Sequence, residues 1–116
     1  MAKLSYITLF VKDIEVVKDW YVKYLGLSIL QESPDFVLLQ GQGGAQLGLH
    51  RGEPLSRPEQ VNLHFEVEDV DAEYKRLKSQ GLRFSQAPQT MPWGYRTAYV
   101  QDPAGHTVEI YMRKRE

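Results

Sequence analysis

The sequence predicts an α+β protein made of two βαβββ modules. Two observations carry this prediction: the chain repeats itself, and each repeat alternates strand and helix patterns. A strand pattern ending in Val-Lys-Asp at residues 11–13 recurs as Val-Glu-Asp at residues 67–69, an offset of 56 residues. The glycines that follow the two helical patterns, Gly26 and Gly81, are 55 residues apart. Self-similarity at a fixed period indicates a repeated structural unit.

The length of 116 residues suits a single domain holding both repeats. We expect module 1 over about residues 1–53 and module 2 over about residues 61–116. The segment between them, about residues 54–60, contains two prolines and is expected to link the modules.

Each module contains one helical pattern that begins after an aspartate and stops at a glycine. Aspartate is a favoured N-cap, and glycine often ends a helix in the left-handed conformation. The helices are expected from Asp13 to Gly26 and from Asp69 to Gly81. Apolar residues at helical spacing mark the face of each helix that should be buried: Val17, Trp20, Tyr21 and Tyr24 in the first, and Val70, Tyr74 and Leu77 in the second.

Eight strand patterns flank these helices. The expected strands are about 4–11, 27–32, 35–40 and 45–50 in module 1, and about 61–68, 82–85, 95–101 and 106–112 in module 2. Glycines at residues 41–44 predict one turn, and Asp-Pro-Ala-Gly at residues 102–105 predicts a type I turn.

Alternation along the strands predicts a mostly antiparallel mixed sheet, cupped, with helices on its outer face. In the first strand Ile7, Leu9 and Val11 should pack beneath the helix. The opposite face carries many aromatic, histidine and amide side chains and few lysines, which favours a small-molecule cleft over a solvated face. The residues expected to bind a ligand there, or beside it, are Tyr6, Thr8, Gly48, His50, Asn62, His64, Trp93, Arg96, Glu109 and Tyr111.

The two βαβββ halves, their strand exits and the segment Asp-Pro-Ala-Gly-His-Thr-Val-Glu at residues 102–109 resemble the vicinal oxygen chelate superfamily. That superfamily includes glyoxalases, bleomycin-resistance proteins, extradiol dioxygenases and fosfomycin-resistance enzymes. The resemblance covers nearly the whole chain. It implies paired modules that bind a small molecule, often across a homodimer, and in the enzymes a divalent metal held by the first and fourth strands of both modules.

The family's metal positions fall on Tyr6, Gly48, Asn62 and Glu109. Only Glu109 is a typical ligand, because a phenol with a pKa near 10 holds its proton and glycine offers no side chain. A stable metal site needs about three strong ligands. We therefore expect no cofactor. The alternative is a rearranged set of His50, His64 and Glu109, which would suit Zn, Ni, Mn or Fe.

Glu109 has several possible roles if no metal is present. A buried carboxylate needs a partner, for which Tyr6, Asn62, Tyr111 and Arg96 are candidates. It could instead bind a cationic ligand, or act as a general acid or base, which makes it the one candidate catalytic residue.

A second informative segment is Met-Pro-Trp-Gly-Tyr-Arg at residues 91–96, within an expected loop over residues 87–95. It resembles the Pro-Trp-Gly loop beside the cleft of bleomycin-resistance-like and dioxygenase-like proteins. Trp93 would then offer a flat surface to an aromatic or cationic ligand. The alternative is that it seals the end of the sheet. His106, after the turn glycine, is expected to be structural.

Composition narrows the classes of function. The net charge of −1 argues against nucleic acid as a partner, and the absence of cysteine excludes disulfides and thiolate chemistry. With no long apolar run we expect neither a membrane span nor a signal peptide, and a cytoplasmic protein. The basic residues 113–115 are read as a solvated end.

Three hypotheses about function follow. The protein binds a small aromatic or cationic molecule without chemistry; or it is a metal-dependent lyase or dioxygenase with a rearranged site; or it has lost its ligand and persists through interaction alone. Because each module leaves sheet edges that need partners, we expect a homodimer.

Overall fold

The structure, a computed structural model, describes residues 1–113 and divides them into two compact units. Unit 1 is Met1–Arg57, and unit 2 begins at Pro58, within the expected linker. Lys114 and Arg115, which were expected to form a solvated end, lie outside the described residues. Within residues 1–113, no helix is long and apolar enough to cross a membrane.

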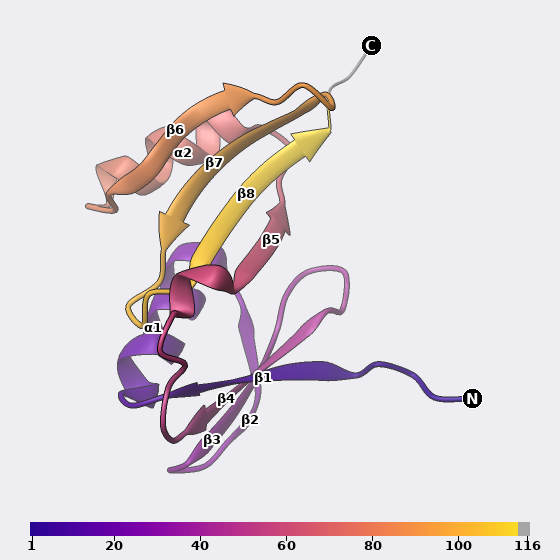
Figure 1. Cartoon of the computed structure of the whole chain (residues 1–116), viewed down its shortest axis with the longest axis vertical. Coiled ribbons are helices and arrows are strands. Elements are labelled where there is room, and N and C mark those ends of the chain that lie inside the picture. The colour runs from indigo at the N-terminus through magenta and orange to yellow at the C-terminus, as the bar shows by residue number, and fades with distance from the viewer. Residues whose placement is uncertain (114–116) are drawn as a thin grey trace. The chain divides into compact units, whose positions relative to one another are not determined.

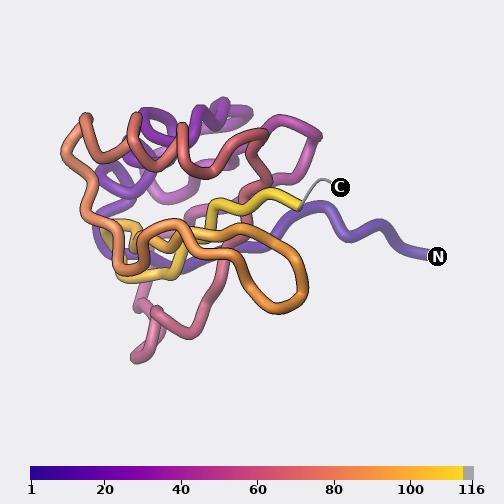
Figure 2. The backbone as a smooth tube through the Cα atoms, turned by 90° about the horizontal axis from the view of Figure 1, so that it is seen from above, coloured from indigo at the N-terminus to yellow at the C-terminus, as the bar shows by residue number. Residues whose placement is uncertain are grey.

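Unit 1 is a single βαβββ module. Its four strands form one sheet in the order β1-β4-β3-β2, in which β1 runs parallel to β4 and the other pairs are antiparallel. Figure 1 labels the elements. The elements are β1 (Tyr6–Val11), α1 (Ile14–Leu25), β2 (Ser28–Glu32), β3 (Phe36–Gln40) and β4 (Gln46–Arg51). Residues 1–5 lead into β1 as an extended segment, indigo in Figure 2.

Unit 2 repeats this topology after one turn of 3-10 helix, η1 (Pro58–Gln60). Its sheet has the order β5-β8-β7-β6, again with one parallel pair, β5 and β8. The elements are β5 (Asn62–Glu66), α2 (Val70–Ser79), β6 (Phe84–Thr90), β7 (Tyr95–Gln101) and β8 (Thr107–Arg113). The prediction of two βαβββ modules with mixed, mostly antiparallel sheets is confirmed.

The helices start and stop where the sequence predicts. The carboxylate of Asp13 accepts a hydrogen bond from the Val16 backbone N–H at 3.2 Å, and Asp69 does the same for Ala72 at 3.1 Å. Gly26, with φ of 70°, and Gly81, with φ of 101°, follow the helices in the left-handed region, which glycine enters without steric cost.

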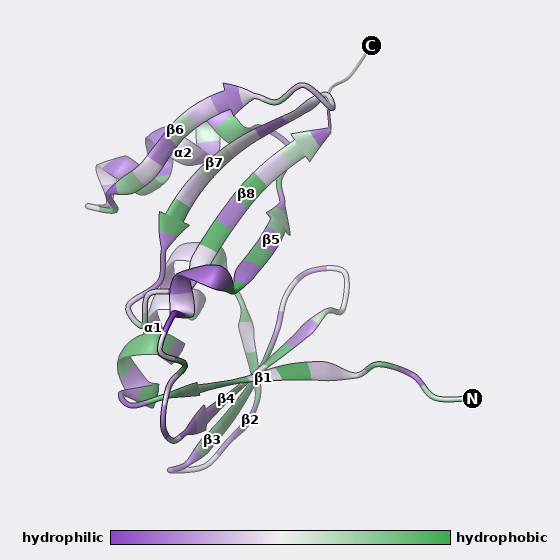
Figure 3. Ribbon diagram, viewed as in Figure 1, coloured by the Kyte–Doolittle hydropathy of each residue, from purple (hydrophilic) through white to green (hydrophobic). Residues whose placement is uncertain are grey.

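Alternation fixes which strand residues face the helices. Hydrophobic and hydrophilic residues alternate along β8 in Figure 3, and Val108 and Ile110 are fully buried. The corresponding prediction for β1 is only partly right. Leu9 and Val11 are buried, but Ile7 is 58% exposed. The reason is that α1 packs chiefly on β3 and β4, which leaves the start of the edge strand β1 uncovered.

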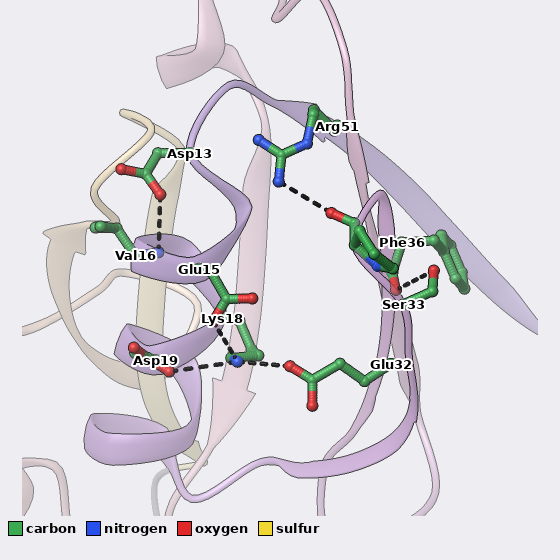
Figure 4. Close-up of polar contacts among 10 residues, drawn as sticks. Asp13, Glu15, Val16, Lys18, Asp19, Glu32, Ser33, Phe36 and Arg51 are labelled. Carbon is green, nitrogen blue, oxygen red and sulfur yellow. Dashed lines mark hydrogen bonds and ion pairs between the residues drawn. The ribbon is translucent and has the colours of Figure 1, made fainter.

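Lys18 ties α1 to β2 in unit 1. Its Nζ lies 2.7 Å from Glu15 and 2.6 Å from Glu32, with Asp19 at 3.7 Å (Figure 4). The side chain is buried, and a buried charge needs such partners. Hydrogen bonds to Glu15 and Glu32 raise the pKa of Lys18 above its ordinary value, so the ammonium stays charged.

Strand β6 is longer than predicted, because it runs to Thr90 rather than ending near residue 85. The predicted loop is thereby reduced to the turn between β6 and β7. Pro88 sits in an edge strand that pairs only with β7, at a place where the register shifts. An edge strand tolerates proline at such a position, because the ladder there needs no N–H.

Candidate functional site

The sheet face opposite the helix, called here the open face, differs in chemistry between the units. In unit 1 it is aromatic. Phe10 and Phe36 flank His50, with ring centroids 5.2 and 6.2 Å from it, and Tyr6 lies 6.2 Å from Phe36. The strand register explains the cluster, since Phe10, His50 and Phe36 are direct neighbours across β1, β4 and β3.

Gly48 lies beneath the side chains of Tyr6, Thr8 and Phe36. A Cβ added there would lie 2.9 Å from Thr8 Oγ1, 3.1 Å from Phe36 and 3.2 Å from Tyr6. Real Cβ atoms essentially never come closer than 3.0 Å. Glycine is therefore required by close packing on this face, and no side chain can project from position 48 without moving its neighbours.

The open face of unit 2 carries a row of polar side chains. His64, Glu109 and Tyr99 are register partners across β5, β8 and β7. His64 Nδ1 is 2.5 Å from Glu109 Oε1, and Glu109 is only 6% exposed. Burial and then a hydrogen bond to Glu109 raise the pKa of Tyr99. Glu109 was expected to pair with Tyr6, Asn62, Tyr111 or Arg96; the partners in the structure are His64 and Tyr99.

Next to this row lies a flat tyrosine pair. The rings of Tyr111 and Tyr95 are stacked, with centroids 5.2 Å apart and planes 11° from parallel. The Arg113 guanidinium lies 6.0 Å from the Tyr95 ring centroid. Tyr111 follows Glu109 by two residues on β8, so both side chains are on the open face.

Arg96 is placed differently from its prediction. It was expected to bind a ligand or to pair with Glu109, but its guanidinium makes a bidentate pair with Asp71 of α2, at 2.7 and 2.9 Å, on the helix-covered face. The hydrogen bond from Arg96 holds the pKa of the Asp71 carboxyl below its ordinary value. The alternation of β7 accounts for this, because buried Ala98 and Val100 share the face of Arg96.

Trp93 lies at the tip of the β6–β7 hairpin. The turn is closed by hydrogen bonds from Met91 N–H to Tyr95 O, at 2.7 Å, and from Gly94 N–H to Met91 O, at 2.9 Å. The indole is 63% exposed, so it does not seal the end of this sheet. Its expected role in ligand binding stays a prediction.

The turn between β7 and β8 is held by its own side chains. Asp102 accepts hydrogen bonds from the backbone N–H groups of Ala104, at 2.9 Å, and His106, at 3.0 Å. His106 Nδ1 lies 2.8 Å from the other carboxylate oxygen, and both residues are buried. These contacts give His106 the structural place that was expected for it.

The residues at the family's metal positions do not fit a divalent ion. Gly48 has no donor, and the Asn62 amide nitrogen donates to the Gln60 carbonyl at 3.3 Å. Glu109, the one strong ligand, is already bonded to His64. Residues 1–113 contain no group of three or more His, Asp or Glu side chains able to hold a metal.

The alternative metal set is divided between the units. His64 and Glu109 are together in unit 2, whereas His50 is in unit 1, where Nδ1 is 2.8 Å from the Arg51 carbonyl oxygen. Both the expected lack of a cofactor and the rearranged site stay predictions.

Several site residues were missed in the sequence. Tyr95, Thr97 and Tyr99 alternate along β7 and share the open face with Glu109. Their period of two was the available signal, but the faces of this strand were not assigned from the sequence. Phe36 was missed because a single aromatic in a short strand does not show which face it joins.

Two sheets of identical topology, each with one helix-covered and one open face, define a protein of paired βαβββ modules. The comparisons with known proteins agree. The model of the Glyoxalase/Bleomycin resistance protein/Dioxygenase superfamily matches residues 3–110, and the chain belongs to that family.

Individual relatives have low sequence identity to this chain. The uncharacterized protein YraH of Bacillus subtilis (strain 168) is 28% identical over 125 aligned positions, which cover 94% of this chain and 97% of the relative. The antibiotic-binding protein TnmS3 from Streptomyces sp. CB03234 is 27% identical, with a TM-score of 0.83 and 98% of each chain covered. Lactoylglutathione lyase from Agrobacterium tumefaciens shares the fold, at 20% identity and a TM-score of 0.79, covering 97% of this chain and 94% of that one.

Proposed function

We propose that the protein binds a small aromatic or cationic molecule on its open sheet faces and does so without a metal centre. The observation that carries the proposal is the packing over Gly48. Where the repeat places Glu109 in unit 2, unit 1 has a glycine beneath Tyr6, Thr8 and Phe36. A position that supplies a metal ligand in related enzymes is here the floor of an aromatic cluster.

Aromatic side chains suit such a ligand for two reasons. Their faces stack on planar apolar molecules and attract cations. Small-molecule sites are usually lined by hydrophobic and aromatic groups with a few polar groups that set orientation. Each open face holds both kinds of group: unit 1 has the rings of Tyr6, Phe10 and Phe36 beside His50, and unit 2 has the stacked Tyr95 and Tyr111 beside the His64–Glu109 pair.

The family allows both binding and catalysis, so the choice depends on the residues of this chain. The similarity to TnmS3, an antibiotic-binding protein, supports a binding role. The likeness to lactoylglutathione lyase concerns the fold alone. The competing proposal is a metal-dependent lyase or dioxygenase. The contact between His64 and Glu109 supports that proposal in part, because it brings together two of the three metal ligands required.

Binding is tested with protein treated with a chelator and then titrated with a panel of aromatic and cationic compounds by calorimetry. We expect saturable binding that weakens at least several-fold in Phe36→Ala, since the ring between Tyr6 and His50 is removed. Val22→Ala, a partly exposed residue of α1, is the matched control and should leave binding unchanged. Failure of every compound to bind would contradict the proposal.

The absence of a metal centre is tested by metal analysis of protein purified without chelator. The proposal expects less than stoichiometric Zn, Ni, Mn or Fe. A stoichiometric metal that disappears in Glu109→Gln would favour the enzyme instead.

We also propose a homodimer. Strands β1 and β5 each pair along one side only within their own sheets, and an unpaired edge is a place for another strand. Exposed apolar residues at the start of β1, Leu4 and Ile7, support association at that edge. Light scattering after size exclusion should give the mass of two chains; a monomer at micromolar concentration would overturn this part of the proposal.

A further inference from the structure

The contacts of Glu109 fix the hydrogen-bond polarity of its neighbours. An ionised carboxylate only accepts hydrogen bonds. His64 Nδ1, 2.5 Å away, must therefore carry a proton and donate it. Glu109 is buried and engaged by His64, so its charge is not open to a ligand.

The other ring nitrogen of His64 has the opposite character. A neutral imidazole that is protonated at Nδ1 has a lone pair at Nε2 and accepts a hydrogen bond there. No hydrogen bond to Nε2 is present among residues 1–113. The His64 side chain is 56% exposed while that of Glu109 is 8% exposed, so the histidine is the member of the pair that a ligand can reach.

A planar surface lies on the same face. On β8, Tyr111 lies two residues after Glu109. On the neighbouring strand β5, Glu66 lies beside Tyr111, and His64 lies beside Glu109. The Tyr111 ring is stacked on the ring of Tyr95, and this contact fixes its orientation. A planar aromatic molecule that stacks beside this pair would bring its substituents near His64.

We propose that the open face of unit 2 selects planar aromatic molecules that carry a hydroxyl group, with the hydroxyl donating its hydrogen bond to His64 Nε2. This inference rests on the proposed binding function and narrows its ligand class. Glu109 is then a positioning residue: it holds the histidine in the tautomer that accepts. A ligand offering only an acceptor at that place leaves Nε2 unpaired and binds more weakly.

The test uses the full chain, treated with chelator, and two fluorescent probes of nearly equal size, 2-naphthol and 2-methoxynaphthalene. The methoxy compound keeps the ring and the oxygen but has no hydrogen to donate. We expect 2-naphthol to bind the wild-type protein roughly 10-fold more tightly, the worth of one hydrogen bond.

The variant His64→Asn removes Nε2, while its amide nitrogen occupies about the place of Nδ1 and can still donate to Glu109. It should reduce the preference for 2-naphthol to within about 2-fold and leave the affinity for 2-methoxynaphthalene unchanged. The matched control is Glu66→Gln, on the same strand and face two residues away, which should keep the preference.

A measurement without any variant guards against loss of folding. Nitrogen NMR of the histidine rings in the wild-type protein should show His64 protonated at Nδ1 when neutral. An Nε2-protonated ring would overturn the inference, whatever the variants do.

Failure of the inference is distinguishable from failure of the proposed function. If both naphthalenes bind equally, the selectivity is refuted while binding of aromatic molecules stands. If neither binds but a cationic compound does, the inference is refuted and the broader proposal survives. If no compound of the panel binds, both are refuted.

Discussion

The two units share a backbone plan, and the central register pair of their open faces shows how far the side chains differ. In unit 1 Thr8 lies opposite Gly48, and in unit 2 His64 lies opposite Glu109. The first pair is covered by aromatic rings, and the second is a hydrogen-bonded acid and base. The comparison teaches that a repeated fold conserves the places at which side chains meet, whereas the chemistry at those places can diverge between copies.

The largest expected effect concerns the turns that precede β4 and β8. The unit 2 turn depends on the Asp102 carboxylate. It accepts hydrogen bonds from the backbone N–H groups of Ala104 and His106 and from the His106 ring. Asp102→Ala should lower the free energy of unfolding by about 2–4 kcal/mol, because donors are left unpaired in a buried site. Urea unfolding measures the change.

The unit 1 turn has no such carboxylate and is built with Gly43 and Gly44 at positive φ. Gln42→Ala, in an exposed position of that turn, should therefore change stability by no more than about 0.5 kcal/mol. Equal losses in the two variants would show that the turns are not held differently.

The second effect concerns Gly48. Gly48→Ala should cost about 1–3 kcal/mol of unfolding free energy, because its Cβ meets Thr8 Oγ1 at 2.9 Å. Thr8→Ala removes that oxygen, so the double variant should lose less than the sum of the two single variants. Additive losses in thermal or urea unfolding would contradict the close packing.

The third effect concerns the polar row of unit 2. Glu109→Gln should cost about 1–2 kcal/mol, since a buried ionised acceptor of the His64 hydrogen bond is replaced by a neutral amide. It should also lower the pKa of Tyr99, because the negative charge that disfavours tyrosinate is gone, although burial still raises the pKa. An NMR titration of the tyrosine rings measures this pKa, with Glu66→Gln as the control. An unchanged pKa of Tyr99 in Glu109→Gln would contradict the prediction.

The smallest effect is that of the Asp71–Arg96 pair on the helix-covered face. Asp71→Asn should cost at most about 1 kcal/mol near neutral pH, because the carboxylate is half exposed. The folded protein lowers the pKa of Asp71, so the stabilisation is present above the ordinary value of 3.8 and is lost as the pH falls through the folded value. The unfolding free energies of wild type and variant should converge in acid. A difference that stays constant with pH would exclude the ionised Asp71–Arg96 pair as its cause.

The sequence predicted the architecture because the repeat, the caps and the alternation all agree. Asp13 and Asp69 mark the helix starts, and the glycines mark their ends. The length of β6 was not predictable, since Pro88 is compatible with either a loop or a shifted edge strand.

The candidate site was predictable only in part. The open-face residues of β1, β4, β5 and β8 follow from alternation in strands with a clear apolar set. In β7 the sequence does not show which face Arg96 joins, because its bidentate partner Asp71 lies 25 residues earlier in the chain, on α2. The tautomer of His64 likewise depends on a partner 45 residues away.

The central claim is that the open faces bind an aromatic molecule without a metal. The most direct test follows the backbone amide NMR spectrum of chelator-treated protein during addition of 2-naphthol. The account predicts saturable shifts concentrated on open-face residues of the sheets, with those of β5, β7 and β8 among them. Shifts that arise only after Zn, Ni, Mn or Fe is added would contradict it.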